Sequence, residues 1–164
     1  MHRIIPFEQS HQEGISRMMN EIQQEFDTTF RKPGSKTISD IASEDDLFWV
    51  ALYENQVVGT IGLTKIDDRS GLLRHLFVSK EHRGSDTGVS KKLLERAFEE
   101  AKKRNYTFLY LGTMDQFKAA QKFYSRNQFM LIPQESLPEN MPVNSMDTLF
   151  YARYLPNEGD SVQW

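Results

Sequence analysis

The sequence predicts an α+β fold around a mixed, mostly antiparallel sheet, and three observations predict it. Short apolar runs bounded by turn signals fill residues 3–7, 47–53 and 56–65, a pattern typical of antiparallel strands. Two amphipathic helical patterns follow in the second half, each between two further apolar runs, as in βαβ units. The 164 residues are 38% hydrophobic, so a single domain can bury a core of ordinary size.

A helix is expected after the first strand. Ser10 and Glu13 have the spacing of a capping box, in which two side chains bond the first free amides of a helix. The apolar face of this helix recurs at helical spacing and comprises Ile15, Met18, Met19, Ile22 and Phe26. We expect a polar loop over residues 28–37 and a short helix over residues 38–43 after it.

An antiparallel hairpin occupies the next segment. Residues 47–53 and 56–65 are separated only by Glu54 and Asn55, and a two-residue connection is typical of a tight hairpin turn. A second turn, of two aspartates and an arginine, leads into an apolar run over residues 72–78. This run is the fourth predicted strand.

The second half alternates helices and strands. The helix that follows Gly88 has an apolar face that comprises Val89, Leu93, Leu94, Ala97, Phe98 and Ala101. Residues 106–111 form a buried strand, and a crossover through this helix predicts that it runs parallel to residues 72–78. The remaining elements are a helix over residues 116–126 and strands over residues 128–132 and 146–155. Four mainly antiparallel strands are therefore followed by a parallel βαβαβ half.

Composition excludes several classes of protein. The chain has no cysteine, which excludes disulfides, thiolate nucleophiles and sulfur-ligated metals, and its four histidines lack metal-binding spacing. No apolar run approaches the ~20 residues of a membrane span, and the N-terminus lacks a signal-peptide pattern. A net charge of −3 argues against nucleic-acid binding. We expect a cytoplasmic protein with no membrane partner, one domain over residues 1–155 and a polar tail over residues 156–164.

Positive charge gathers in one segment of this acidic chain. Five basic residues between Arg74 and Lys92 stand against two acidic ones, a balance of +3 that leaves −6 for the remainder. The segment runs from an apolar strand through a glycine-bearing loop into a helix. Backbone amides and the positive end of the helix dipole converge at such a place, which favours a phosphate-bearing ligand. The alternative is a merely structural turn.

Two segments resemble signatures of the GNAT N-acetyltransferase superfamily. The run LFVSKEHRG at residues 76–84 resembles the pattern L-Y-V-x-P-x-x-R-G, and AQKFYSRNQF at residues 120–129 resembles A-x-x-F-Y-x-x-x-G-F. They lie in the family's order, with a helix and a strand of fitting length between them. The resemblance implies an acyl-CoA N-acyltransferase-like fold, with helices on both faces of the sheet and splayed parallel strands 4 and 5, between which acyl-CoA lies.

The chain departs from the family pattern at several positions. The family loop R/Q-x-x-G-x-G/A is matched by residues 88–90 if the loop is two residues longer than usual. Leu93 and Leu94 then follow the first glycine by the usual five and six positions. Phe117 stands where asparagine is frequent, and Gln128 replaces the usual glycine.

The resemblance implies direct transfer of an acetyl group from acetyl-CoA to a primary amine, with a small molecule as the expected acceptor. Tyr124 matches the family tyrosine that protonates the departing CoA thiolate, and a phenol of ordinary pKa ~10 holds that proton at neutral pH. The implied pantetheine-binding residues on the fourth strand are Leu76, Phe77 and Val78. The implied pyrophosphate-binding residues are Arg83, Gly84, Thr87, Gly88, Val89 and Ser90.

Neither the general base nor the acceptor is identified by the resemblance. Many family members carry a carboxylate on the fourth strand, where this chain has Leu72 and Leu73. His75 lies on that strand and could titrate near neutrality, although we favour a water chain. By family analogy residues 28–37 and 134–146 border the acceptor, and a protein N-terminus or lysine is the alternative to a small molecule.

Two other functions fit the same residues. A non-catalytic acyl-CoA-binding module would explain the missing carboxylate and the altered positions, and it would bind CoA without turnover. A phosphate binder unrelated to CoA would bind nucleotides that lack pantetheine equally well. At the level of residues, Arg83 could be a solvated cation and Tyr124 a core aromatic beside Phe123. The terminal strand could pair across a homodimer or form an edge strand within one chain.

Overall fold

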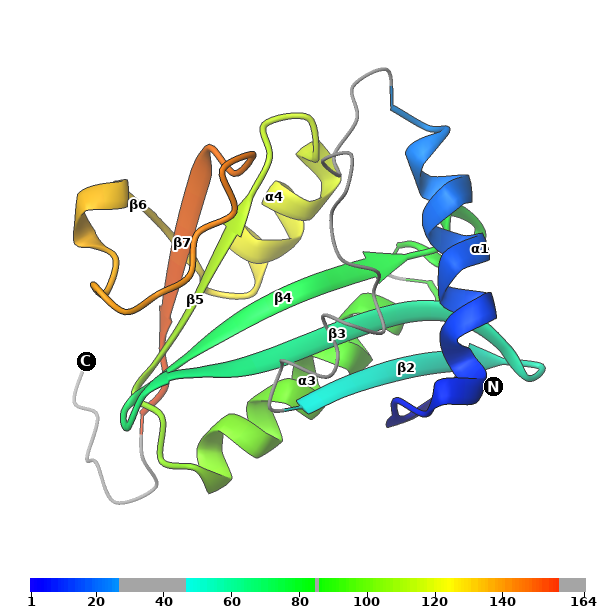
Figure 1. The fold of residues 1–164 in the computed structure, drawn as a ribbon, viewed down its shortest axis with the longest axis horizontal. Helices are drawn as coiled ribbons and strands as arrows, with labels where there is room; N and C mark the ends of the chain where they lie inside the picture. Colours follow the sequence, from blue (N-terminus) through cyan, green and yellow to red (C-terminus); the bar gives the residue numbers. More distant parts are fainter. Residues whose placement is uncertain (27–46, 85, 157–164) are drawn as a thin grey trace. The chain divides into compact units, whose positions relative to one another are not determined.

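The computed structural model describes residues 1–26, 47–84 and 86–156 (Figure 1). Its strands form a seven-stranded mixed sheet in the order β1-β2-β3-β4-β5-β7-β6, which confirms the predicted fold class. Residues 1–64 with 74–98 make one compact unit, the first unit. Residues 65–73 with the chain from residue 99 onward make the second unit.

Some predictions fall on other residues. The loop over residues 28–37, the short helix over residues 38–43 and the tail from residue 157 lie outside the described residues. The single domain over residues 1–155 stays a prediction. Within the described ranges, no helix is long and apolar enough to cross a membrane.

The first unit begins with antiparallel strands. β1 (Arg3–Pro6) pairs with β2 (Leu47–Tyr53), and β2 pairs with β3 (Gln56–Asp67). The predicted hairpin turn is confirmed, with Glu54 at φ 49° and Asn55 at φ 65°. Two positive φ angles in a two-residue loop are those of a type I′ turn, whose twist matches that of the flanking strands.

The first helix, α1 (Gln12–Gln23), has four of the five predicted apolar-face residues but ends before Phe26, and it lacks the predicted cap. Its buried residues are Ile15, Met18, Met19 and Ile22. The capping box expected at Ser10 is wrong, because a 3-10 turn, η1 (Gln9–His11), precedes the helix. Glu8 caps that turn, and its N–H donates to His11 Nδ1 at 2.9 Å. The imidazole nitrogen of His11 thus takes the acceptor role that the sequence pattern gave to Glu13.

The helix α3 (Val89–Lys103) covers the other face of the first-unit strands. Figure 1 shows α1 in front of β2 and β3 and α3 behind them. Gly59 allows the close approach of α3, since a Cβ there would lie 2.9 Å from Leu93 Cδ1. On β2, Trp49 is 2% exposed, and the guanidinium of Arg96 lies 5.2 Å from its ring centroid. Helices therefore lie on both faces of these strands, as predicted.

The strands β4 (Ser70–Val78) and β5 (Phe108–Thr113) are parallel, which confirms the predicted crossover. β5 and the first four residues of β4 belong to the second unit. Their pairing begins at Ser70 and Phe108 and ends at Leu72 and Tyr110. Both strands continue beyond that point, β4 for six residues and β5 for three. The end of pairing inside two continuing strands is what splayed strands require.

The last three elements correct the predicted parallel half. The helix α4 (Lys118–Arg126) leads to β6 (Met130–Ile132), and a 3-10 turn, η3 (Gln134–Ser136), follows. The final strand β7 (Leu149–Tyr154) pairs antiparallel with both β5 and β6 and separates them. Because both edges of β7 are paired within the chain, it is not an edge strand and cannot add a strand across a dimer. A homodimer stays a prediction.

Candidate functional site

The loop between β4 and α3 takes its shape from two glycines. After Val78 the chain makes a 3-10 turn, η2 (Lys80–His82), and enters α3 at Val89. Gly84 has φ 101° and Gly88 has φ 66°, values in the left-handed region that side chains other than glycine rarely adopt. Among the described residues, nothing lies within 4 Å of a Cβ built at either position, so the requirement they show is conformational and not steric.

Hydrogen bonds hold this loop against the start of α3. The Thr87 hydroxyl donates to the His82 carbonyl and to the Gly84 carbonyl, and the Gly88 N–H donates to the Gly84 carbonyl at 3.2 Å. The Lys92 N–H donates to the Gly88 carbonyl at 3.0 Å. Val89 and Ser90 open the helix, and the first turn of a helix is a place where backbone amides can bind phosphate.

The Arg83 side chain is bonded to protein groups. Its Nη1 and Nη2 donate to the two carboxylate oxygens of Glu25 at 2.5 and 2.7 Å, and its Nε donates to the Val78 carbonyl at 2.8 Å. The side chains of Arg83 and Glu25 are 34% and 21% exposed, so the pair is partly shielded from water. Arg83 thus ties the loop to the chain just after α1, and its role in binding the cofactor stays a prediction.

Two histidines meet beside the same loop. His2 Nε2 and His82 Nδ1 are 2.9 Å apart, and both rings lie about 5 Å from the Tyr53 ring. Burial lowers the pKa of His2, and the positive charges of His82, Lys92 and the N-terminus lower it further. The neutral form of His2 is therefore favoured in the folded protein.

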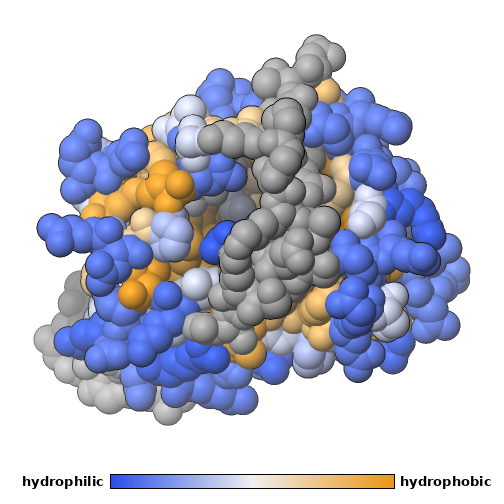
Figure 2. Space-filling model, in the orientation of Figure 1, coloured by the Kyte–Doolittle hydropathy of each residue, from blue (hydrophilic) through white to orange (hydrophobic). Residues whose placement is uncertain are grey.

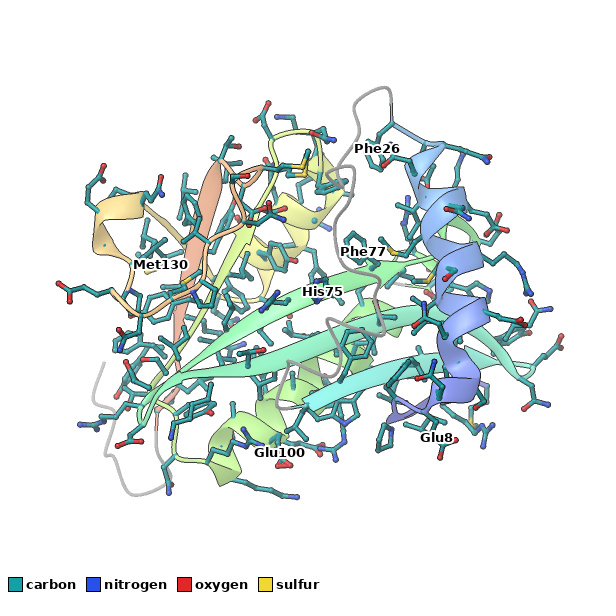
Figure 3. All side chains as sticks on the ribbon, in the orientation of Figure 1. Glu8, Phe26, His75, Phe77, Glu100 and Met130 are labelled. Atoms are coloured by element: carbon teal, nitrogen blue, oxygen red, sulfur yellow. The ribbon has the colours of Figure 1, made fainter. Side chains whose placement is uncertain are left out.

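The fourth strand bends where the pantetheine-binding residues were predicted. His75 has φ 56°, a strained angle for a side-chain-bearing residue within a strand, and its carbonyl accepts from the Thr60 hydroxyl at 2.7 Å. The His75 ring lies 6.1 Å from the Phe48 ring, which settles the face that the sequence left open. Leu76 and Phe77 are half-buried and Val78 is buried. Figure 3 labels His75 and Phe77 on this strand.

Tyr124 is buried among aromatic rings in the second unit. It is 7% exposed, and its ring lies 5.7 Å from Phe129, 5.7 Å from Tyr151 and 6.0 Å from Phe123. Burial raises its pKa well above the ordinary value of 10, and the charge of Asp147 raises it further. The phenol is therefore protonated at every physiological pH, which is the state that a general acid needs.

Two residues in these surroundings were missed by sequence reasoning. Glu25 bonds Arg83 across 58 positions of sequence, and Asp147 interacts with Tyr124 from the segment before β7. Neither belongs to a short motif, and no spacing rule connects either with its partner. Only the folded chain brings them together.

A sequence model of the acetyltransferase (GNAT) family matches residues 15–129, which include the glycine loop and Tyr124. The chain belongs to this family. Among GNAT relatives, it is 30% identical to human N-acetyltransferase 8B over 115 residues, 67% of this chain and 50% of that protein. It is 33% identical to zebrafish (Danio rerio) N-acetylaspartate synthetase over 108 residues, 63% of this chain and 37% of that protein. The chain spans about half the length of the curated relatives it matches.

Solved GNAT structures match more of the chain. An acetyltransferase of Staphylococcus aureus Mu50 superposes with a TM-score of 0.86 at 33% identity, covering 95% of this chain and 100% of that one. A GNAT acetyltransferase of Elizabethkingia anophelis, solved with acetyl-CoA bound, superposes with a TM-score of 0.65. At 16% identity over 94% of this chain and 98% of that one, it supports the fold alone.

Proposed function

We propose that this GNAT protein transfers an acetyl group from acetyl-CoA directly to a primary amine of a small molecule. The observation that carries the proposal is the buried, protonated Tyr124 at the position of the family's acidic tyrosine. Family membership supports both the reaction type and acetyl-CoA as the cosubstrate.

The loop before α3 would hold the pyrophosphate by its main chain. Gly84 and Gly88 give the backbone its turn, Thr87 fixes that turn, and the amides at Val89 and Ser90 open the helix. In this proposal Arg83 acts through the ion pair that holds the loop. Leu76, Phe77 and Val78 would bond the pantetheine amides as an added strand does.

The reaction needs two proton transfers besides the acyl transfer. The neutral amine attacks the thioester carbonyl, a C–N bond forms and the C–S bond breaks. Tyr124 donates its phenolic proton to the departing thiolate, and the proton that leaves the nitrogen restores the phenol. A thiolate released without this proton would be the better nucleophile for the reverse reaction, so its protonation favours the products.

Calorimetric titration with acetyl-CoA tests the cosubstrate, with ADP and dephospho-CoA as controls. We expect micromolar binding that requires the pantetheine arm, followed by release of free thiol when primary amines are added. Equal binding of ADP would contradict the proposal and favour a simple phosphate binder. Binding of acetyl-CoA without thiol release from any amine would favour a non-catalytic binding module.

A further inference from the structure

The carboxylate of Asp147 lies directly on the backbone of β5 in the second unit. Its Oδ2 would be 2.7 Å, and its Cγ 3.1 Å, from a Cβ built on Gly112. Any side chain at position 112 would occupy the place of this carboxylate. Gly112 is two residues beyond Tyr110, the last β5 residue that pairs with β4. The carboxylate therefore sits where the parallel strands have ceased to pair.

The segment before β7 holds Asp147 in this place. The Met146 N–H donates to Asn144 Oδ1 and the Asp147 N–H donates to the Asn144 carbonyl, both at 3.0 Å. The Thr148 N–H donates to the Thr113 carbonyl at 3.0 Å. The Asn144 side chain and carbonyl therefore close the turn that carries Asp147.

Asp147 and Tyr124 reach β5 from opposite faces of the sheet. Gly112 pairs with Phe150 and Leu111 with Tyr151, and adjacent residues of a strand point to opposite faces. The Tyr124 ring packs on Tyr151. Asp147 and the Phe150 ring lie instead on the side of β5 to which a Cβ at position 112 would point. The charge of Asp147 nevertheless acts on the Tyr124 phenol.

We propose that Asp147 binds the acceptor as an ammonium ion and takes the first proton from it. This inference rests on the proposed function, in which Tyr124 protonates the thiolate. It assigns the substrate class as an amine that is cationic at neutral pH, since a carboxylate attracts the ammonium form and removes its proton.

Protons and bonds balance in this scheme. Asp147 accepts one proton from the ammonium group and passes it to solvent, which leaves the neutral amine. The amine forms the C–N bond, the C–S bond breaks, and Tyr124 protonates the thiolate. The second nitrogen proton restores Tyr124, so the products are the amide, CoA thiol and one proton released to water.

A shallow hollow beside Asp147 suits the apolar part of such an amine. Thr148, the next residue, lines it together with Ile132, Pro133 and Phe150, and its volume is about 360 Å³. Figure 2 shows hydrophobic side chains gathered over the β6–β7 part of this face among hydrophilic ones. An aryl-alkyl amine such as benzylamine is therefore a suitable probe.

The test compares benzylamine, which is cationic at neutral pH, with aniline, which is neutral. In Asp147→Asn we expect thiol release with benzylamine to fall by about 10²-fold, while aniline turnover and acetyl-CoA affinity stay within about twofold. Asp147→Glu, which keeps the base, should recover most of the benzylamine rate. Asp115→Asn removes a carboxylate on the same unit that bonds Lys118 and should change neither rate.

A second measurement needs no acceptor. Alkaline titration of tyrosinate absorbance should show the latest-ionising tyrosine moved to lower pH in Asp147→Asn and absent in Tyr124→Phe. Gly112→Ala, which displaces the carboxylate without removing it, should reproduce both effects of Asp147→Asn in part and stands in for it if that variant does not fold. Unchanged benzylamine turnover in Asp147→Asn, or an unmoved tyrosine titration, would overturn the proposal. If turnover is lost in Tyr124→Phe but not in Asp147→Asn, the role of Asp147 is overturned and the proposed function stands. If Tyr124→Phe keeps the wild-type rate, Tyr124 is not the acid, and both the proposed function and the role of Asp147 lose their basis.

Discussion

The glycine loop before α3 and the surroundings of Tyr124 are built from different parts of the chain. The loop consists of main chain held at unusual angles, at Gly84 and Gly88, and the side chain of Arg83 is bonded to Glu25. The surroundings of Tyr124 consist of side chains, with rings packed around a buried phenol and a carboxylate acting on it. A main-chain site tolerates changes of side chain but not of φ, and a side-chain site has the opposite sensitivity.

This difference explains why a family motif predicts backbone conformation better than it predicts side-chain contacts. An arginine beside a glycine suggests a phosphate contact, yet the structure gives Arg83 the carboxylate of Glu25 as its partner. The glycines, by contrast, do what their residue type predicts, because φ is a property of one residue. Motif letters indicate backbone shape more securely than they indicate what a long side chain touches.

The largest effect is expected from a change in the side-chain site, the surroundings of Tyr124. Tyr124→Phe removes the hydroxyl and keeps the ring, so packing against Phe129 and Tyr151 should survive. We expect kcat to fall by roughly 10²-fold or more with little change in acetyl-CoA affinity. Steady-state thiol release together with calorimetric titration measures both, and Phe123→Leu is the matched control for loss of a neighbouring aromatic.

The raised pKa of Tyr124 also fixes the alkaline behaviour of the wild type. Because burial holds the phenol protonated well beyond its ordinary pKa of 10, kcat should not decline through tyrosine ionisation up to about pH 10. A loss of kcat with an apparent pKa near or below the ordinary value, absent from Tyr124→Phe, would show that the phenol is solvated in the working enzyme.

The next largest effect is expected from a change in the main-chain site, the glycine loop before α3. Replacing Gly88 at φ 66° should weaken acetyl-CoA binding least with Asn, more with Ala and most with Val. Asn tolerates the left-handed region, whereas a β-branched residue does not. A strain of about 1–2 kcal/mol in Gly88→Ala corresponds to roughly a five- to thirtyfold higher Kd. The rate at saturating acetyl-CoA should stay near that of the wild type. Equal losses in all three variants would indicate a steric requirement, although the space around Gly88 is open.

The ion pair sharpens the comparison, since it is a side-chain contact inside the main-chain site. Arg83→Ala and Glu25→Gln should each lower the free energy of unfolding by about 1 kcal/mol or less, because the pair is only partly shielded. Acetyl-CoA affinity should change by less than about threefold in either, with Glu21→Gln on α1 as the control. If Arg83 binds phosphate instead, Arg83→Ala would lose about tenfold in affinity, and Glu25→Gln would gain.

Sequence patterns predicted most of the sheet but not its order at one end. The hairpin at Glu54 and Asn55 and the parallel crossover into β5 followed from local signals, turn chemistry and helix length. The insertion of β7 between β5 and β6 did not, because pairing partners far apart in sequence leave no local mark. For the same reason Tyr124 was found from its motif, whereas Glu25 and Asp147 were visible only in the folded chain.

A smaller effect concerns pH and the histidine pair beside the loop. The folded protein lowers the pKa of His2 below the ordinary 6.5, so the unfolded chain binds a proton at higher pH than the folded one does. The free energy of unfolding should therefore fall as pH drops below about 6.5. Melting temperatures at about pH 7.5 and about pH 5.5 measure this, and both His2→Gln and His82→Gln should reduce the difference. An equal difference in all three proteins would assign it to other groups.

The smallest effect lies beside the side-chain site and tests whether backbone strain matters there too. Gln128, where the family has glycine, has φ 65° and joins α4 to Phe129, whose ring packs on Tyr124. Gln128→Gly relieves a strain of about 1–2 kcal/mol, but the greater freedom of glycine in the unfolded chain costs about 0.5–1 kcal/mol. The free energy of unfolding should therefore rise by at most about 1.5 kcal/mol. Chemical denaturation measures this, and kcat should stay unchanged because the rings keep their places. A lower kcat in this variant would mean that the strained angle helps to hold Tyr124, and the side-chain site would then depend on its backbone as the loop does.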